Sequence, residues 1–331
     1  MAHPKSSTGY KLGIVNPLTL VGNELKTILR ERSFPFAKVV LLDSIGKSGA
    51  LTEVDDEPAV VAAATAEELE DLDLVFFCGP PAGNRDLMAL HRQLDFIAID
   101  LSRPTSAEDG KLTVAGINVD ELDPDDLLVS PHPIALPIAL ILQQLGKLAA
   151  IESCIASVVQ PASEFGQEAV EELAQQTIAV LNIQPLPQEV FDRQAAFNLY
   201  PATQRHEELI VSQVKTLADA RTEIALMVAQ GTIFHGHTFS LFMRTHEPLE
   251  ESKIIAALKS NPVFVFPEGD QQFGTVDAAG KDEVLIAEVR AEPSIRGGFW
   301  VWAVCDNLRR SSALNAILIA EKALFGAEMA N

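Results

Sequence analysis

Short apolar runs that alternate with helical segments constrain the fold of the first part of this chain most strongly. Residues 11–15 and 38–42 have the character of strands, and residues 21–32 between them have the periodicity of a helix. This spacing suits a right-handed βαβ unit. Three further apolar runs of strand length lie at residues 74–77, 96–99 and 127–129. The pattern predicts a doubly wound, parallel α/β sheet over the first 130 or so residues.

The pattern changes after Pro131-His132-Pro133. A helix is predicted at residues 136–148, and longer strand-like runs then surround one helix. These runs are residues 151–159, 224–228, 233–243, 284–290 and 299–305. Their length favours a second, α+β domain with a mostly antiparallel sheet. Residues 185–201 are rich in proline, glutamine and aromatic residues without clear periodicity, which predicts a long excursion that covers a partner subunit.

Composition excludes several kinds of partner. The formal net charge is −21 and no polybasic segment offsets it, so neither nucleic acid nor anionic lipid is an expected ligand. No signal-like apolar core and no run of about 18 uncharged apolar residues is found, so the expected location is the cytoplasm. Cys78, Cys154 and Cys305 lie far apart in apolar runs, which predicts buried, reduced thiols.

The segment after the last predicted strand carries the most specific motif. Residues 306–321, DNLRRSSALNAILIAE, resemble the closing helix of aspartate-semialdehyde dehydrogenases. Gln160, Gly236-His237 and the run FNLYP at 197–201 resemble further motifs of that family, and the resemblance extends from residue 12 to residue 324. It implies two domains. They are a Rossmann-like NAD(P)-binding domain at residues 1–132, completed by a C-terminal helix at 308–331, and an α+β catalytic-type dimerisation domain with a mixed or antiparallel sheet at 133–307.

The first βα turn is the predicted dinucleotide site, because a glycine-rich turn there lets pyrophosphate approach the backbone. Set against the family's GxxGxxG turn, only the third glycine is kept, as Gly22. Asp43 ends the second strand and favours NAD over NADP, since a carboxylate repels a 2′-phosphate; the alternative is an aspartate that caps a loop. The cofactor-binding residues that the resemblance implies are Asn16, Thr19, Gly22, Asp43, Gly79 and Asn307.

The nucleophile position departs from the family. The family's cysteine lies in a segment like Asn-Pro-Asn-Cys-Ser-Thr at a helix N-terminus, and the similar segment here, residues 130–135, is SPHPIA. Pro133 stands at the cysteine position and has neither a thiol nor a backbone N–H. Thioester chemistry is therefore not expected at this position.

The other site positions are kept in part. Gln160 matches the glutamine that positions the substrate, and His237 matches the acid/base histidine. Gln230 lies seven residues before His237, where the family has an arginine that clamps the substrate carboxylate. The phosphate-contacting arginine falls at Ser106, and Arg103 offers a substitute from a different angle.

A metal site is the alternative interpretation of the histidines. His235 and His237 share a face if both lie on one strand, and the resemblance brings the loop with His132 near His237. The competing interpretation is a hydrogen-bonded histidine that remains on a family framework. No metal is predicted.

The joint departures at Pro133, Gln230 and Ser106 resemble the Usg-type paralogues of the family. They predict a homodimeric pseudoenzyme that binds NAD or another protein and lacks the classical activity in amino-acid biosynthesis. One alternative is a non-covalent, NAD-linked oxidoreductase on an aldehyde or oxo substrate, with His237 as acid/base and Gln160 to orient the carbonyl. Another is a heteromeric partner that regulates a true dehydrogenase.

Overall fold

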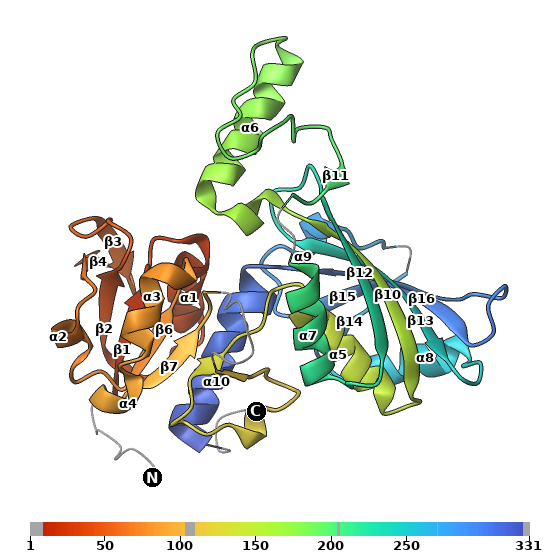
Figure 1. The fold of residues 1–331 in the computed structure, drawn as a ribbon, viewed down its shortest axis with the longest axis horizontal. Coiled ribbons are helices and arrows are strands. Elements are labelled where there is room, and N and C mark those ends of the chain that lie inside the picture. The colour runs from red at the N-terminus through yellow and green to blue at the C-terminus, as the bar shows by residue number, and fades with distance from the viewer. Residues whose placement is uncertain (1–8, 103–109, 204–205, 270, 327–331) are drawn as a thin grey trace. The chain divides into compact units, whose positions relative to one another are not determined.

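The computed structural model describes residues 9–102, 110–203, 206–269 and 271–326 (Figure 1). The chain divides into two units. Unit 1 consists of Met1–His132 with Ser312–Asn331, and unit 2 consists of Pro133–Ser311. Among the described residues, no helix is both long enough and apolar enough to cross a membrane.

Unit 1 is built on a seven-stranded sheet in the order β5-β2-β1-β6-β7-β9-β8, in which every pair is parallel. Its strands are β1 Tyr10–Val15, β2 Phe36–Asp43, β5 Ala62–Ala63, β6 Leu74–Phe77, β7 Ile97–Asp100, β8 Lys111–Leu112 and β9 Leu128–Val129. A hairpin of β3 Leu51–Val54 and β4 Glu57–Val60 lies between β2 and β5 in the chain. The predicted doubly wound parallel sheet is confirmed.

Helices cover both faces of this sheet. They are α1 Leu20–Glu31, α2 Ala66–Leu69, α3 Pro81–Met88, α4 His91–Leu94 and α10 Leu314–Phe325. Leu12 and Ile14 of β1 pack in one core cluster with α1 and α10, while Val15 packs in the other with Met88 of α3. Alternate β1 side chains point to opposite faces, as strand geometry requires. β1 lies between β2 and β6, so the ends of β1 and β6 form the topological switch point of the sheet.

Unit 2 contains a second seven-stranded sheet in the order β11-β12-β10-β13-β16-β15-β14. Its strands are β10 Ile151–Gln160, β11 Tyr200–Pro201, β12 Glu223–Gln230, β13 His237–Thr245, β14 Phe264–Val265, β15 Val284–Ala291 and β16 Gly298–Cys305. The pairs β10–β12 and β14–β15 are parallel, and the other four are antiparallel. The expected mixed, mostly antiparallel sheet is therefore confirmed.

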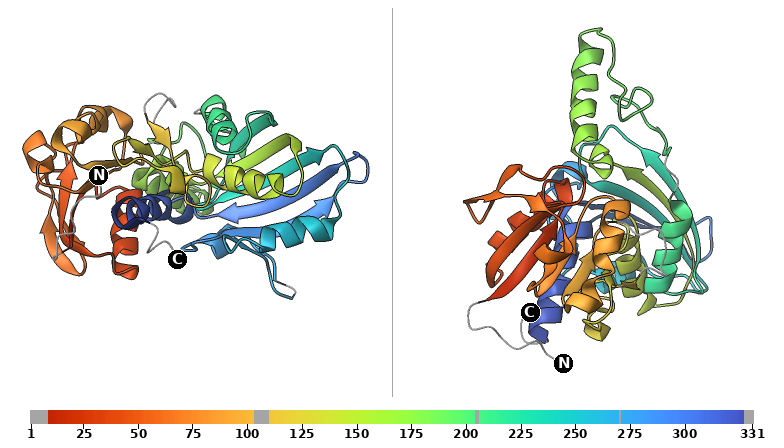
Figure 2. Two further views of the ribbon diagram at one scale, coloured as in Figure 1. Left: turned by 90° about the horizontal axis from the view of Figure 1, so that it is seen from below. Right: turned by 60° about the vertical axis from the view of Figure 1, so that its left-hand side comes forward.

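The helix predicted at residues 136–148 is confirmed as α5, but the expectation of one further helix in unit 2 is wrong. Its helices are α5 Ala135–Gly146, α6 Gln167–Leu181, α7 Glu207–Leu217, α8 Glu251–Lys259 and the short α9 Thr275–Ala278. α5 packs against both α7 and α8. In turn, α7 packs on β12 and α8 packs on β15. α6 extends away from the sheet (Figures 1 and 2). The β-branched residues of α7 favour a strand locally, and burial of Ile210 and Val214 decides for a helix.

Two element boundaries also differ from expectation. The strand predicted at residues 233–243 begins only at His237, because Gly236 has a φ of 85° and turns the chain. The helix predicted at 308–331 starts as a π-helical turn, Arg309–Ala313, before α10.

Candidate functional site

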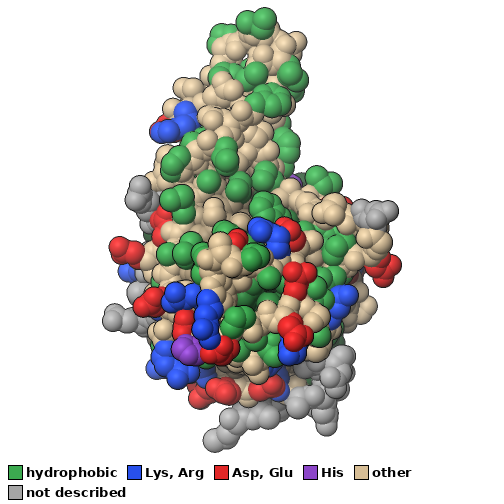
Figure 3. Space-filling view, turned by 90° about the vertical axis from the view of Figure 1, so that its right-hand side faces the viewer, with side chains coloured by type: hydrophobic (Ala, Val, Ile, Leu, Met, Phe, Trp, Pro, Cys, Tyr) green, Lys and Arg blue, Asp and Glu red, His purple; other side chains and the backbone are tan. Residues whose placement is uncertain are grey.

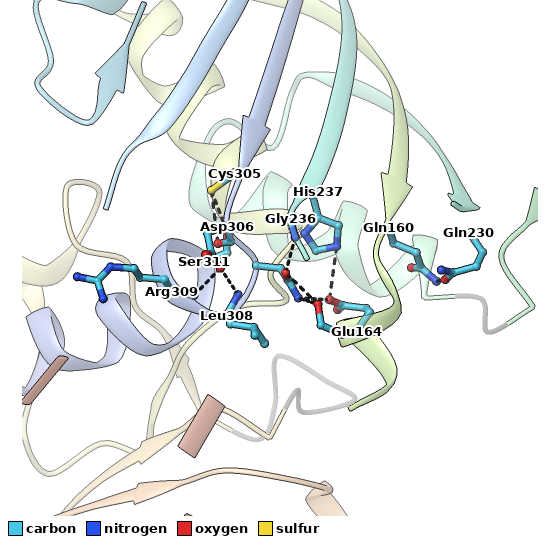
Figure 4. A network of polar contacts seen from close by, with 12 residues as sticks. Gln160, Glu164, Gln230, Gly236, His237, Cys305, Asp306, Leu308, Arg309 and Ser311 are labelled. Atoms are coloured by element: carbon cyan, nitrogen blue, oxygen red, sulfur yellow. Dashed lines mark hydrogen bonds and ion pairs between the residues drawn. The ribbon is translucent and has the colours of Figure 1, made fainter. Parts of the chain in front are cut away.

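Four polar side chains form a row at one end of the unit 2 sheet, one from each of four adjacent strands. Gln230 is paired with Gln160 between β12 and β10, and His237 is paired with Cys305 between β13 and β16. Val159 lies opposite Thr238, so Gln160 and His237 are the next residues along that pair of strands. All four are buried. We call Gln230, Gln160, His237 and Cys305 the polar row (Figure 4).

The two glutamines of the polar row bond to each other. Gln160 Nε2 donates to Gln230 Oε1 at 3.2 Å, and Gln230 Nε2 donates to the carbonyl of Gly231 at 3.0 Å. Both residues were predicted as site residues, and the structure brings them together. Neither amide carries a charge, so this end of the row lacks the cationic clamp that a substrate carboxylate prefers.

Glu164 lies beside His237, and sequence reasoning missed it. Its Oε2 is 3.5 Å from His237 Nε2, and the two side chains are 5% and 0% exposed. Glu164 belongs to the 3-10 turn Ala162–Phe165 that directly follows β10. The available signal was an acidic residue in an otherwise small and apolar segment after a predicted strand. The tertiary structure thus places a carboxylate next to the histidine that the resemblance assigns to proton transfer.

Asn307 connects Glu164, the neighbour of His237, to the backbone of Gly236. Its Oδ1 accepts from Gly236 N at 2.9 Å, and its Nδ2 donates to Glu164 Oε2 at 3.3 Å and to Ser163 Oγ at 3.1 Å. The residue is fully buried. These bonds place Asn307 beside Glu164 within unit 2, and its role in cofactor binding stays a prediction.

The three cysteines of the chain are all fully buried. Burial raises the pKa of the Cys154 and Cys305 thiols to about 12, and it raises the pKa of Cys78 as well. Cys305, the member of the polar row, has its Sγ 3.2 Å from Ser311 Oγ. Pro133, at the predicted nucleophile position, is buried shortly before α5. These thiols are held in the neutral form, which is a poor nucleophile.

The residues predicted to hold a dinucleotide in unit 1 lie around the switch point. Asn16 and Thr19 form the β1–α1 turn, and the Thr19 hydroxyl accepts from Gly22 N at 3.1 Å as the N-cap of α1. Gly79 follows β6 and has a φ of 79°. Asp43 Oδ2 accepts from Ile45 N at 3.2 Å and also from Lys47 N. The Asp43 carboxylate therefore caps its own loop, the role considered as its alternative.

Two of the predicted positions, Ser106 and Arg103, lie outside the described residues. The metal interpretation needed His235 and His237 on one strand, but His235 precedes the turn at Gly236 and is not part of β13. Within the described ranges, no group of three or more His, Cys, Asp or Glu side chains is placed to hold a metal ion.

Comparison with known proteins agrees with this architecture. Residues 142–310, about half of the chain, match the family model of the semialdehyde dehydrogenase dimerisation domain. The chain is 29% identical to a USG-1 protein homolog from Azotobacter vinelandii, over 95% of this chain and 98% of that one. It is 25% identical to the aspartate-semialdehyde dehydrogenase of Aquifex aeolicus, over 95% and 97% of the two chains.

A solved structure gives the same result. A probable aspartate-semialdehyde dehydrogenase from Pseudomonas aeruginosa superposes with a TM-score of 0.91 at 25% identity, covering 96% of this chain and 99% of that one. The resemblance seen in the sequence is confirmed at the level of the family. The chain belongs to the aspartate-semialdehyde dehydrogenase family, with its dimerisation domain in unit 2.

Proposed function

We propose that this chain is a homodimeric family member that does not carry out a thiol-dependent oxidation of a semialdehyde. The observation that carries the proposal is the state of the three thiols, which are all buried with raised pKa values. At pH 7 a pKa of about 12 leaves about one thiol in 10⁵ ionised. The covalent route requires a thiolate, and the resemblance puts Pro133 where that thiolate should be.

A direct assay tests the proposal. Purified protein is incubated with aspartate semialdehyde, phosphate and either NAD or NADP, and absorbance of the reduced nicotinamide is followed. We expect no phosphate-dependent turnover in the wild type or in Cys305→Ser. Turnover in the wild type that disappears in Cys305→Ser would show that the polar-row cysteine serves as the nucleophile and would overturn the proposal.

A second candidate is the non-covalent, NAD-linked oxidoreductase. The contact between His237 and the Glu164 carboxylate favours it, because a paired imidazole is suited to proton transfer at a carbonyl. The cofactor in this case would be NAD rather than NADP, because the Asp43 carboxylate at the end of β2, although it caps its own loop, would still repel a 2′-phosphate. A panel of aldehydes and ketones with NADH tests it. His237→Ala should abolish any turnover, and equal rates in the variant and the wild type would eliminate this candidate.

The homodimer is proposed to form on the face of the unit 2 sheet that α5, α7 and α8 leave uncovered. Ile155, Met227 and Trp302 on this face are 53%, 67% and 42% exposed. The strand register aligns Met227 with Trp302 through Ser157 and Ser240, so the apolar side chains lie on one surface. Further exposed apolar residues, Ile178 and Leu181, lie on α6, where Figure 3 shows hydrophobic side chains at the surface. Apolar surface of this kind marks an interface.

Ile155→Asp is expected to weaken the dimer at least ~10-fold, because a second copy would bury the new carboxylate without a partner. Light scattering after size exclusion measures the effect. Val60→Asp is the control, since Val60 is 62% exposed in β4 of unit 1 and does not belong to this face. A dimer that survives Ile155→Asp unchanged would contradict the placement, and mixed dimers with a relative in extract would favour the heteromeric alternative.

A further inference from the structure

Asn16 occupies the position at which a dinucleotide fold brings its cofactor closest to the backbone. It directly follows β1, at the switch point between β1 and β6. The residue is 1% exposed and has a φ of 59°. Asparagine tolerates this left-handed conformation because its short side chain bonds locally.

The Asn16 amide connects the ends of three strands. Its Nδ2 donates to the carbonyl of Cys78 after β6 at 2.8 Å and lies 3.0 Å from Ser44 Oγ after β2. Its Oδ1 accepts from Ser44 N at 2.9 Å. Asn84 in α3 completes the cluster, with its Oδ1 3.0 Å from Ser44 Oγ and its Nδ2 donating to Cys78 O at 2.7 Å. We call Asn16, Ser44 and Asn84 the amide plug.

The amide plug fills the space beside the glycines. A Cβ at Gly79 would lie 3.0 Å from Asn16 Nδ2, and a Cβ at Gly83 would lie 2.9 Å from Ser44 Oγ. In a dinucleotide-binding domain, a missing Cβ at such turns leaves room for the cofactor's phosphates. Here that room is taken by side chains of the protein itself.

Few backbone N–H groups around the switch point are available to a ligand. Gly22 N in the first turn of α1 is bonded to the hydroxyl of its own N-cap, Thr19. Pro17 in the β1–α1 turn and Pro80 and Pro81 at the start of α3 have no N–H. Pyrophosphate is normally held by such N–H groups at helix N-termini. The residues present therefore do not fit a dinucleotide in the usual position.

We propose that the amide plug closes the switch point of unit 1 and prevents dinucleotide binding there. The inference concerns unit 1 and does not depend on the thiols of unit 2. It goes beyond the proposed function, because it excludes the NAD-linked alternative and makes unit 1 a scaffold. It also reverses the expectation that Asn16 and Gly79 bind cofactor.

Calorimetric titration of the full chain with NAD, NADH, NADP and NADPH tests the proposal. We expect no binding to the wild type up to roughly 1 mM ligand. Asn16→Gly removes the amide and keeps the φ of 59°, which glycine adopts without steric cost. This variant should bind at least one of the four nucleotides at least ~10-fold more tightly than the wild type.

The control is Asp55→Gly, an exposed residue of the β3–β4 turn with a φ of 52°, which should gain no affinity. Micromolar binding by the wild type overturns the proposal. If the Asn16→Gly protein folds but binds no nucleotide more tightly than the wild type, the amide plug is not what prevents binding and the proposal is overturned. If Asn16→Gly does not fold, the double variant Ser44→Ala with Asn84→Ala opens the same space, and absence of a gain there contradicts the proposal equally.

Discussion

Glu172→Ala is expected to lower the free energy of unfolding by about 3–5 kcal/mol. Glu172 lies in α6 and is 5% exposed. Its carboxylate accepts from three successive backbone N–H groups, those of Glu189, Val190 and Phe191, at 2.8, 2.6 and 3.1 Å. Alanine would leave the buried N–H of Phe191 and the part-buried N–H groups of Glu189 and Val190 without their acceptor. The carboxylate therefore helps to hold the excursion predicted at residues 185–201 to α6, together with Gln176 of the same helix, which bonds to the backbone of Pro187, Arg193, Ala195 and Ala196.

Urea denaturation of Glu172→Ala and of Glu168→Ala measures this effect. Glu168 is exposed in the first turn of the same helix, so its loss should cost at most about 1 kcal/mol through the helix dipole. Glu172→Gln keeps an acceptor oxygen without the charge and should fall between the two. Equal midpoints for Glu172→Ala and Glu168→Ala would show that the excursion does not depend on the carboxylate.

Gly297→Ala is expected to destabilise unit 2 by about 4 kcal/mol or more. Gly297 has a φ of 73°, and a Cβ there would lie 1.9 Å from the carbonyl oxygen of Thr245. The same turn closes the β13–β16 pair, because Thr245 N donates to the Gly297 carbonyl at 3.0 Å. The backbone segments at Gly297 and Thr245 would have to separate at the end of these strands, so the hydrogen bond between them should be lost.

Gly280→Ala is the matched control, because Gly280 has a φ of 72° and open space around its Cβ position. This variant should cost only the left-handed conformation, about 1–2 kcal/mol. The difference between the two variants in thermal or urea unfolding isolates the steric clash. If Gly297→Ala and Gly280→Ala unfold at the same midpoint, a Cβ at residue 297 does not clash with the Thr245 carbonyl and the prediction is wrong.

Much of the fold was predictable from local patterns. The apolar runs of unit 1 became the parallel strands β1, β2, β6, β7 and β9, because strands buried on both faces are apolar throughout. The strand at 233–243 was misjudged, since its apolar residues continue across the turn at Gly236. Helix α7 was missed because its β-branched residues favour a strand until packing against α5 decides.

The candidate site was predictable only in part. Gln160, Gln230 and His237 were identified from resemblance, and the strand register places them in one row. Glu164 was missed, because a carboxylate in a turn gives no sign of which strand end it will face. Asn307 was identified from resemblance as a cofactor residue, which stays a prediction, and only the tertiary structure shows that it bonds to both Glu164 and Gly236.

The sequence by itself determined the two kinds of sheet, the family and the identity of Pro133, since these depend on short-range patterns and residue types. Tertiary structure decided what those residues contact. It set Glu164 beside His237 and turned the Asn16 amide onto Ser44 and Cys78, whereas the burial of the three thiols had been predicted from their apolar surroundings. The physical reason is sequence distance: these partners are joined only when strands distant in the chain become neighbours in a sheet, and burial then fixes their charge and their hydrogen bonds.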